Sequence, residues 1–194
     1  MGSRGAKAQT RGLQMGQAGQ AERVGPMLGV LQAIALILVG VALVPALAHV
    51  LELPGKKRLS EDAYFAVQTI YYPGFTVAGI AEPLSLIATI TLLCFTPAGG
   101  VDFWLMLVAV VGLLGMQVVY WLITHPVNRY WIQGQRLGSL GAGFFSLAPT
   151  KRPGGQSETH SVSWIVLRDR WEYSHLVRAL LVLASLVALV LAVT

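Results

Sequence analysis

Charged residues are scarce in this sequence, and long stretches contain none. Asp, Glu, Lys and Arg make up 12% of the 194 residues, whereas hydrophobic residues make up 55%. Soluble domains typically carry about 25% charged residues. Because the few charges are also clustered between long apolar runs, the composition excludes an ordinary water-soluble domain and indicates a protein embedded in lipid.

Cysteine is nearly absent, and so is any basic–aromatic array. Cys94 is the single cysteine, so the chain can form neither an intrachain disulfide nor a cysteine-based metal site. We interpret Cys94 as a small buried hydrophobic side chain. The basic residues behind the net charge of +5 are not interleaved with aromatic residues as on RNA-binding surfaces. We therefore expect no nucleic-acid partner.

Four apolar runs are long enough to cross a membrane. A span needs about 20 apolar residues to cross about 30 Å of hydrocarbon, and the backbone amides of a single span must pair within it, as in a helix. We therefore predict an all-α integral membrane protein, a four-helix bundle surrounded by the lipid bilayer. The predicted domain is residues 26–194, with spans at about 27–51, 75–95, 101–124 and 171–193 and a loop at 125–170.

The segment before the first span is too polar to form a core. Residues 1–25 are rich in Gly, Gln and Ala and are predicted to be a flexible N-terminal tail. The sequence Ala46-Leu47-Ala48 resembles a signal-peptidase site. The apolar run around it is about twice the length of a typical signal core, so we expect this run to remain as the first span.

Four spans place both termini on one side of the membrane, which we call side A. The two longer loops, residues 52–74 and 125–170, then lie on the other side, side B. Lys and Arg are more numerous in these loops than in the N-terminal segment. Because loops rich in Lys and Arg stay in the cytoplasm, we expect side B to be cytoplasmic in a multi-pass protein of the bacterial inner membrane.

The first side B loop contains a predicted interfacial amphipathic helix. Ser60 is a suitable N-cap before an acidic first turn. Apolar residues then recur at helical spacing over residues 63–71, which is typical of a helix that lies in the plane of the interface. Aromatic residues suited to the headgroup region lie in these loops: Tyr71, Tyr72 and Trp131.

Polar residues within and beside the spans all fall toward side B. Ionisable side chains inside a span cost about 2.5–3.5 kcal/mol each and usually pair in the protein interior. We therefore expect Glu82 and Arg178 to point inward and to be paired, with His49 or Glu172 as candidate partners. Pro83 is expected to kink the second span. The whole polar set is His49, Glu52, Glu82, Gln117, His125, Asn128, Glu172, His175 and Arg178.

Three interpretations of this polar set compete. Its members either pair to lock the bundle, form a small-molecule site, or hold a metal ion. Histidine and carboxylate side chains do bind hard and borderline metals. The twin Glu-x-x-His signature of di-iron bundles is missing, however, and we predict no metal ligands.

Four segments carry a resemblance to a known family. They are His49-Val-Leu-Glu-Leu-Pro-Gly-Lys56, residues 63–71, Pro126-Val-Asn128 and Leu167-Arg-Asp-Arg-Trp-Glu-Tyr-Ser-His175. In these segments the chain resembles the anthrone-oxygenase-like family of small membrane proteins, over about residues 27–193. The loop at 125–170 departs from the expected pattern by a Gly-rich insertion.

The resemblance implies a four-helix membrane fold. In fungal members it also implies oxidation of anthrones to anthraquinones without a conventional cofactor; the residues themselves identify no cofactor. The positions to which the resemblance extends are His49, Glu52, Asn128, Trp171, Glu172 and His175.

We hypothesise an oxygenase site for a lipophilic aromatic substrate at side B. Its catalytic residues would be His49, His175 and Glu52, and the two histidines are the best candidates for a base because a free imidazole titrates near ambient pH. The alternative is a non-catalytic membrane subunit or lipophile-binding protein of a larger complex. The candidate substrate-binding residues are Glu82, Gln117, His125, Asn128, Trp131, Trp171, Glu172 and Arg178.

Overall fold

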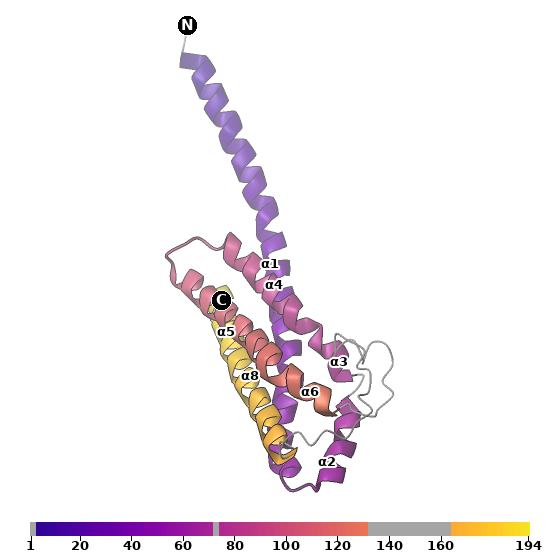
Figure 1. Cartoon of the computed structure of the whole chain (residues 1–194). Helices are drawn as coiled ribbons and strands as arrows, with labels where there is room; N and C mark the ends of the chain where they lie inside the picture. The colour runs from indigo at the N-terminus through magenta and orange to yellow at the C-terminus, as the bar shows by residue number, and fades with distance from the viewer. Residues whose placement is uncertain (1–2, 72–73, 132–163) are drawn as a thin grey trace.

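A computed structural model describes residues 3–71, 74–131 and 164–194, without the side chains of residues 3–25 and 129–131. Every regular element within these ranges is a helix (Figure 1). The elements in chain order are α1 (Ser3–Lys56), α2 (Glu61–Gln68), the 3₁₀ helix η1 (Thr69–Tyr71), α3 (Gly74–Gly79), α4 (Ala81–Phe95), α5 (Val101–Val119), the π-helix η2 (Tyr120–Thr124), α6 (His125–Trp131) and α8 (Trp164–Val193).

Four helical segments are long and apolar enough to cross a membrane, which confirms the predicted fold class. They are Pro26–Lys56, Gly74–Phe95, Val101–Asn128 and Trp164–Val193. Figure 1 shows that α2 lies at the end of the bundle opposite to the C-terminus. The chain is therefore a helical, multi-pass membrane protein.

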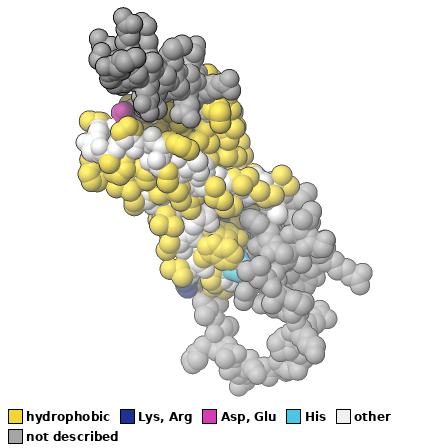
Figure 2. All heavy atoms as spheres, turned by 90° about the horizontal axis from the view of Figure 1, so that it is seen from above, with side chains coloured by type: hydrophobic (Ala, Val, Ile, Leu, Met, Phe, Trp, Pro, Cys, Tyr) yellow, Lys and Arg dark blue, Asp and Glu magenta, His cyan; other side chains and the backbone are white. Residues whose placement is uncertain are grey.

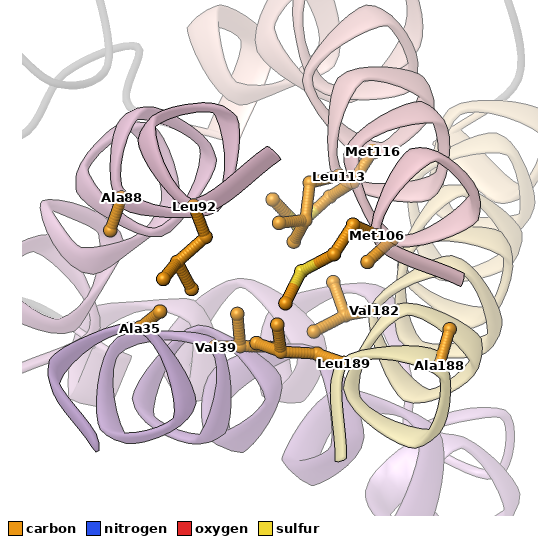
Figure 3. Packing of buried hydrophobic residues seen from close by; sticks show 11 residues of the cluster. Ala35, Val39, Ala88, Leu92, Met106, Leu113, Met116, Val182, Ala188 and Leu189 are labelled. Carbon is orange, nitrogen blue, oxygen red and sulfur yellow. The ribbon is translucent and has the colours of Figure 1, made fainter. Parts of the chain in front are cut away.

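The packed core of the bundle is apolar and made largely of small and branched side chains. Helix α8 packs against α5 and α1, and α4 packs against α1. Small residues at such contacts allow helix backbones to approach closely within lipid. Figure 3 shows the cluster, which includes Ala35, Val39, Ala88, Leu92, Met106, Leu113, Met116, Val182, Ala188 and Leu189.

The outer surface of the bundle is also apolar. Large hydrophobic side chains of all four spans point outward, and Figure 2 shows hydrophobic side chains over much of the face in view. Cys94 is among the exposed residues, so our expectation of a buried side chain was wrong. A thiol is apolar enough to face lipid as readily as a core.

The N-terminal segment is helical from Ser3 onward. Helix α1 is continuous from Ser3 to Lys56, and Figure 1 shows it extending beyond the other helices. Ala, Gln, Lys and Arg are good helix formers, which favours a helix even without packing partners. The flexibility of residues 1–25 stays a prediction.

Helices extend into the predicted 125–170 loop from both of its ends. Helix α6 continues the third span to Trp131, and α8 begins at Trp164, before the predicted start of the last span. Charged residues of the predicted loop are paired within the first turns of α8. Arg168 lies 5.1 Å from the Trp164 ring centroid and 2.9 Å from a carboxylate oxygen of Asp169.

The second and third spans are both interrupted near side B. Helix α3 ends at Gly79 and α4 begins at Ala81, because Pro83 has no N–H to donate to the Gly79 carbonyl. In the third span, the π-helix η2 changes the helical phase. Thr124 is therefore buried whereas Trp121 is 49% exposed, although a regular helix would place them on one face.

The predicted interfacial helix is present as α2 and η1. The Ser60 hydroxyl accepts a hydrogen bond from the Ala63 amide at the start of α2. Tyr71 was expected among lipid headgroups, but it is buried. Its hydroxyl finds a partner inside the protein, as described below, and Tyr72 lies outside the described residues.

Candidate active site at the side B end

The bundle buries a cluster of polar side chains toward side B, as the sequence predicted. The cluster draws on α1, α2, α4, η2, α6 and α8. Because lipid cannot hydrogen-bond these groups, each must find partners inside the protein. The polar residues of this cluster with an exposed fraction of 6% or less are His49, Lys56, Glu82, Thr124, His125, Asn128, Glu172, Ser174, His175 and Arg178.

Lys56 occupies the centre of one part of the cluster. Its ammonium nitrogen lies 2.9 Å from His49 Nδ1, 3.0 Å from Glu52 Oε2 and 3.4 Å from Glu172 Oε1. His49, Glu52 and Lys56 follow one another at spacings of three and four residues, so they share one face of α1. We had counted Lys56 only as a loop charge, and this spacing was the signal for its role.

Two tyrosines from the interfacial segment complete the carboxylate partners. The Tyr64 hydroxyl donates to Glu172 Oε1 at 2.8 Å, and the Tyr71 hydroxyl donates to Glu52 Oε2 at 2.6 Å. Burial, followed by the neighbouring carboxylates, raises the pKa of both tyrosines above the ordinary value. Both hydroxyls therefore stay protonated and keep donating. Sequence reasoning placed neither tyrosine in the site.

The His49 imidazole is surrounded by other rings. Trp171 and Tyr71 meet it edge-on, and Trp171 also contacts the His175 ring at 4.4 Å between centroids. Such packing holds the imidazoles in an apolar setting beside the charged groups. The ring centroids nearest to His49 are those of His175 (4.1 Å), Tyr71 (4.5 Å), Trp171 (4.7 Å) and Phe75 (5.1 Å).

The deeper part of the cluster is built around Arg178. One guanidinium nitrogen donates to Glu82 Oε1, and another lies 3.1 Å from His175 Nδ1. The guanidinium also lies 5.1 Å from the Tyr120 ring centroid. The expected inward orientation of Glu82 and Arg178 is thus confirmed, but they pair with each other instead of with the candidate partners His49 and Glu172.

Residues of the third span hold α8 in register with the site. The Trp171 indole N–H donates to Asn128 Oδ1 at 2.6 Å, and the hydroxyls of Thr124 and Ser174 lie 2.8 Å apart. The Ser174 hydroxyl also donates to the Trp171 carbonyl. The phase change at η2 makes these contacts geometrically compatible, since it turns Thr124 toward α8.

Two of the predicted substrate-binding residues, Gln117 and His125, take no part in the contacts described above. Gln117 is half-buried one turn before η2. His125 packs on the rings of Tyr120 and Trp121. The side chain of Trp131 lies outside the described residues.

Some buried polar atoms of the cluster have no hydrogen-bond partner among the residues that the structure describes. They include Glu172 Oε2 and His175 Nε2. A buried polar atom without a partner costs about 1–3 kcal/mol. Such atoms therefore mark where a substrate or ordered water would find complementary groups.

Metal binding is disfavoured by the charge already present in the cluster. Within the described ranges, no group of three or more His, Cys, Asp or Glu side chains is placed to hold a metal ion. His49, Glu52 and Glu172 converge instead on the Lys56 ammonium. A metal ion there would have to displace a paired cation.

One comparison with known proteins gives a match. The family described as anthrone oxygenase matches residues 67–188, which is more than half of the chain and includes α3 to α6 and most of α8. Glu82, Asn128, Trp171, Glu172, His175 and Arg178 lie inside the matched range, whereas His49, Glu52 and Lys56 precede it. No curated protein and no solved structure matches the chain.

Proposed function

Because the chain belongs to the anthrone oxygenase family, we propose that it is a membrane oxygenase that acts on a lipophilic, anthrone-like aromatic substrate at the side B cluster. The observation that carries the proposal is the pair of buried imidazoles, His49 and His175, set 4.1 Å apart between ring centroids beside Trp171. Ion pairs that only lock the bundle do not call for two adjacent imidazoles. Two imidazoles beside an indole ring suit a site that acts on a flat, apolar substrate.

The proposed reaction is balanced without a cofactor. A base removes one proton from the CH2 carbon of the anthrone, whose carbonyl and aromatic rings acidify it. The resulting carbanion gives two electrons to O2, and a C–O bond forms to a hydroperoxide. Loss of the second C–H proton and cleavage of the O–O bond release water and leave the ketone. One oxygen atom enters the product, so the reaction is a monooxygenation.

The cluster supplies the groups that this reaction needs. His49, His175 and Glu52 remain the proposed catalytic residues, with Glu172 beside them. Trp171 and Phe75 offer ring faces and edges for a planar substrate, and the apolar surroundings limit access of water to the carbanion. Arg178, which is paired with Glu82, contacts His175, and Asn128 accepts a hydrogen bond from Trp171. These contacts hold the rings of the site in place.

The test is anthrone oxidation by the purified full-length protein in nanodiscs. We expect the His49→Ala, His175→Ala double variant to be slower by about 10²-fold or more, the usual loss when a catalytic acid–base or hydrogen-bonding group is removed. One anthraquinone, measured by its absorbance, should form for each O2 consumed. Val44→Ala with Val177→Ala is a matched control, because both valines lie on the exposed faces of the same helices.

Equal rates for the wild type and the histidine variant would reject the enzyme interpretation. The alternative is a non-catalytic membrane subunit or lipophile-binding protein. It would be supported by isolation of the chain in a stable larger complex, or by retention of a hydrophobic ligand without its oxidation.

A further inference from the structure

Both imidazoles of the cluster present the same ring nitrogen to a cation. His49 Nδ1 lies 2.9 Å from Lys56 Nζ, and His175 Nδ1 lies 3.1 Å from Arg178 Nη1. Ammonium and guanidinium groups carry only N–H donors, so Nδ1 is the acceptor in each contact. We propose that Lys56 and Arg178 are positioning residues that hold both imidazoles in the tautomer with the proton on Nε2.

Each cation is itself fixed by several contacts. Lys56 is 3% exposed and paired with Glu52 and Glu172. It also lies 4.8 Å and 5.2 Å from the ring centroids of Tyr71 and Trp171. Arg178 is 4% exposed, paired with Glu82 and placed over the Tyr120 ring. Two charged donors held this firmly determine the tautomer of a neighbouring neutral ring.

The competing tautomer of His49 would donate from Nδ1 to Glu52. That nitrogen lies 3.7 Å from Glu52 Oε2, which is beyond normal hydrogen-bond length. The contact with Lys56 is shorter by 0.8 Å, the difference between 3.7 Å and 2.9 Å. Geometry therefore favours Lys56 as the partner of Nδ1.

The tautomer gives the histidines a chemical role that rests on the proposed function. An Nε2–H group donates a hydrogen bond, and a ring whose Nδ1 is engaged by a cation has no free lone pair with which to act as a base. The imidazoles therefore stabilise the carbonyl oxygen of the anthrone as it becomes an enolate. One such donor is typically worth about 10²–10³ in rate.

The proton of the CH2 carbon then goes to a carboxylate. Glu172 Oε2 is buried and has no hydrogen-bond partner within the described part of the chain, whereas Oε1 is engaged by Tyr64 and Lys56. Oε2 is thus the oxygen placed to accept the proton. The electron pair of the C–H bond moves to the carbonyl oxygen, where His175 Nε2, also without a described partner, is placed to donate.

The test is nitrogen NMR of full-length protein in nanodiscs with ¹⁵N-labelled histidine. The two ring nitrogens of a neutral histidine have well-separated shifts, so the protonated one is identified directly. Single His→Gln variants at positions 49, 125, 160 and 175 assign the four histidines. We expect His49 and His175 to show a protonated Nε2 and an unprotonated Nδ1.

Removing one cation should free the tautomer equilibrium of only the imidazole that it contacts. In Lys56→Met, the His49 shifts should move toward the average of a tautomer mixture while those of His175 stay in place. Lys56→Arg keeps a donor and should restore the wild-type pattern and most of the oxidation rate. A purely structural role for Lys56 would not produce this selective shift.

The outcomes separate this inference from the proposed function. A protonated Nδ1 in the wild type would overturn the inference even if no Lys56 variant folds, and so would unchanged His49 shifts in folded Lys56→Met. If the Nε2–H pattern is found but the wild type oxidises no anthrone, the tautomer assignment stands and the proposed function fails.

Discussion

The two halves of the bundle are held together by different interactions. Toward side A, the core consists of residues such as Leu92, Met106 and Leu189, which interact through van der Waals packing. Toward side B, the helices are joined by ion pairs and hydrogen bonds among buried residues such as Lys56 and Glu172. Because lipid is as apolar as a leucine core, packing in the first half depends on close fit, whereas the second half depends on complete pairing of polar groups.

This contrast teaches where the chain tolerates change. A polar group that loses its partner in lipid has no water to replace it, so a single substitution toward side B should cost more than a comparable change toward side A. Variants compared within one region or across the two test that difference.

The largest effect is expected when the Glu82–Arg178 pair is broken on one side. Glu82→Leu leaves a buried guanidinium without its carboxylate, and loss of one partner of a buried pair typically costs about 3–5 kcal/mol. The double variant Glu82→Leu, Arg178→Leu removes both charges and should recover most of that loss. The free energy of unfolding, measured by denaturing-detergent titration in mixed micelles, is the readout.

A Glu82→Leu variant as stable as the wild type would show that this pair does not hold the side B half together. A double variant less stable than either single variant would show instead that the charges contribute net stability. Leu86→Ala, a partly buried position one turn further along α4, is the comparison within the same helix for a change in packing alone.

The second effect concerns a close approach of α5 and α8 at Gly112. A Cβ atom at Gly112 would overlap the Ser185 hydroxyl and lie 3.1 Å from the Leu181 carbonyl oxygen. The backbone carbonyl cannot move aside as a side chain can, so Gly112→Ala should separate α5 from α8. Overpacking of this kind typically costs about 1–3 kcal/mol, measured by the same titration.

Two other glycines provide matched controls for Gly112. A Cβ at Gly115 would meet Leu181 Cδ1 at 3.4 Å, an ordinary contact, and one at Gly40 would meet nothing within 4 Å. Gly115→Ala and Gly40→Ala should be neutral or stabilising, since Ala is favoured over Gly in a helix by up to about 1 kcal/mol. If all three variants behave alike, close approach of α5 and α8 is not what holds the apolar half.

Sequence reasoning reached the fold and the end of the bundle at which polar residues are buried, because both follow from composition. Apolar run length determines the spans, and the polar residues fall toward one end in every run. The inward orientation of Glu82 and Arg178 followed from the cost of an isolated charge in lipid, although their pairing with each other did not. None of these inferences required knowledge of how one helix is rotated against another.

The pairing within the site did require that knowledge. The π-helix η2 turns Thr124 inward and Trp121 outward. The residue types at 120–124 do not predict such a change of helical phase. Tyr64 and Tyr71 were missed because an apolar face on a short helix equally suits headgroups or a protein interior. Lys56 was missed because it lies one turn beyond the last apolar residue of its span, where a lysine is usually solvated.

The third effect is the loss of one hydrogen bond to Glu172. Tyr64→Phe removes the donor to Oε1 but leaves Lys56 at 3.4 Å, so we expect a loss of about 1.5 kcal/mol, typical of a hydrogen bond to a charged group. Tyr173→Phe is the control, since Tyr173 is an exposed tyrosine of α8. Equal losses for the two variants would contradict a specific role for Tyr64.

The Tyr64 contribution should also depend on pH in one direction. Burial raises the pKa of the folded-state Tyr64 hydroxyl above its value in the unfolded chain, which is about 10. A raised folded-state pKa means that the contribution is complete below about pH 10 and is lost as pH rises further. The stability difference between wild type and Tyr64→Phe should therefore stay constant through neutral pH and shrink only above about pH 10.

The smallest effect separates burial from charge at two adjacent lysines. Lys57 donates to the Tyr173 hydroxyl at 2.7 Å, but this contact is exposed, and water readily replaces an exposed partner. Lys57→Met should therefore leave the unfolding free energy and the anthrone oxidation rate unchanged, whereas Lys56→Met should lower both. Both variants remove one positive charge from the same end of α1, so they alter the long-range field and the topology signal almost equally. If Lys57→Met lowers stability and oxidation rate as much as Lys56→Met does, the side B end depends on its total positive charge. The paired cluster around Lys56 would then not explain why this end of the bundle differs from the other.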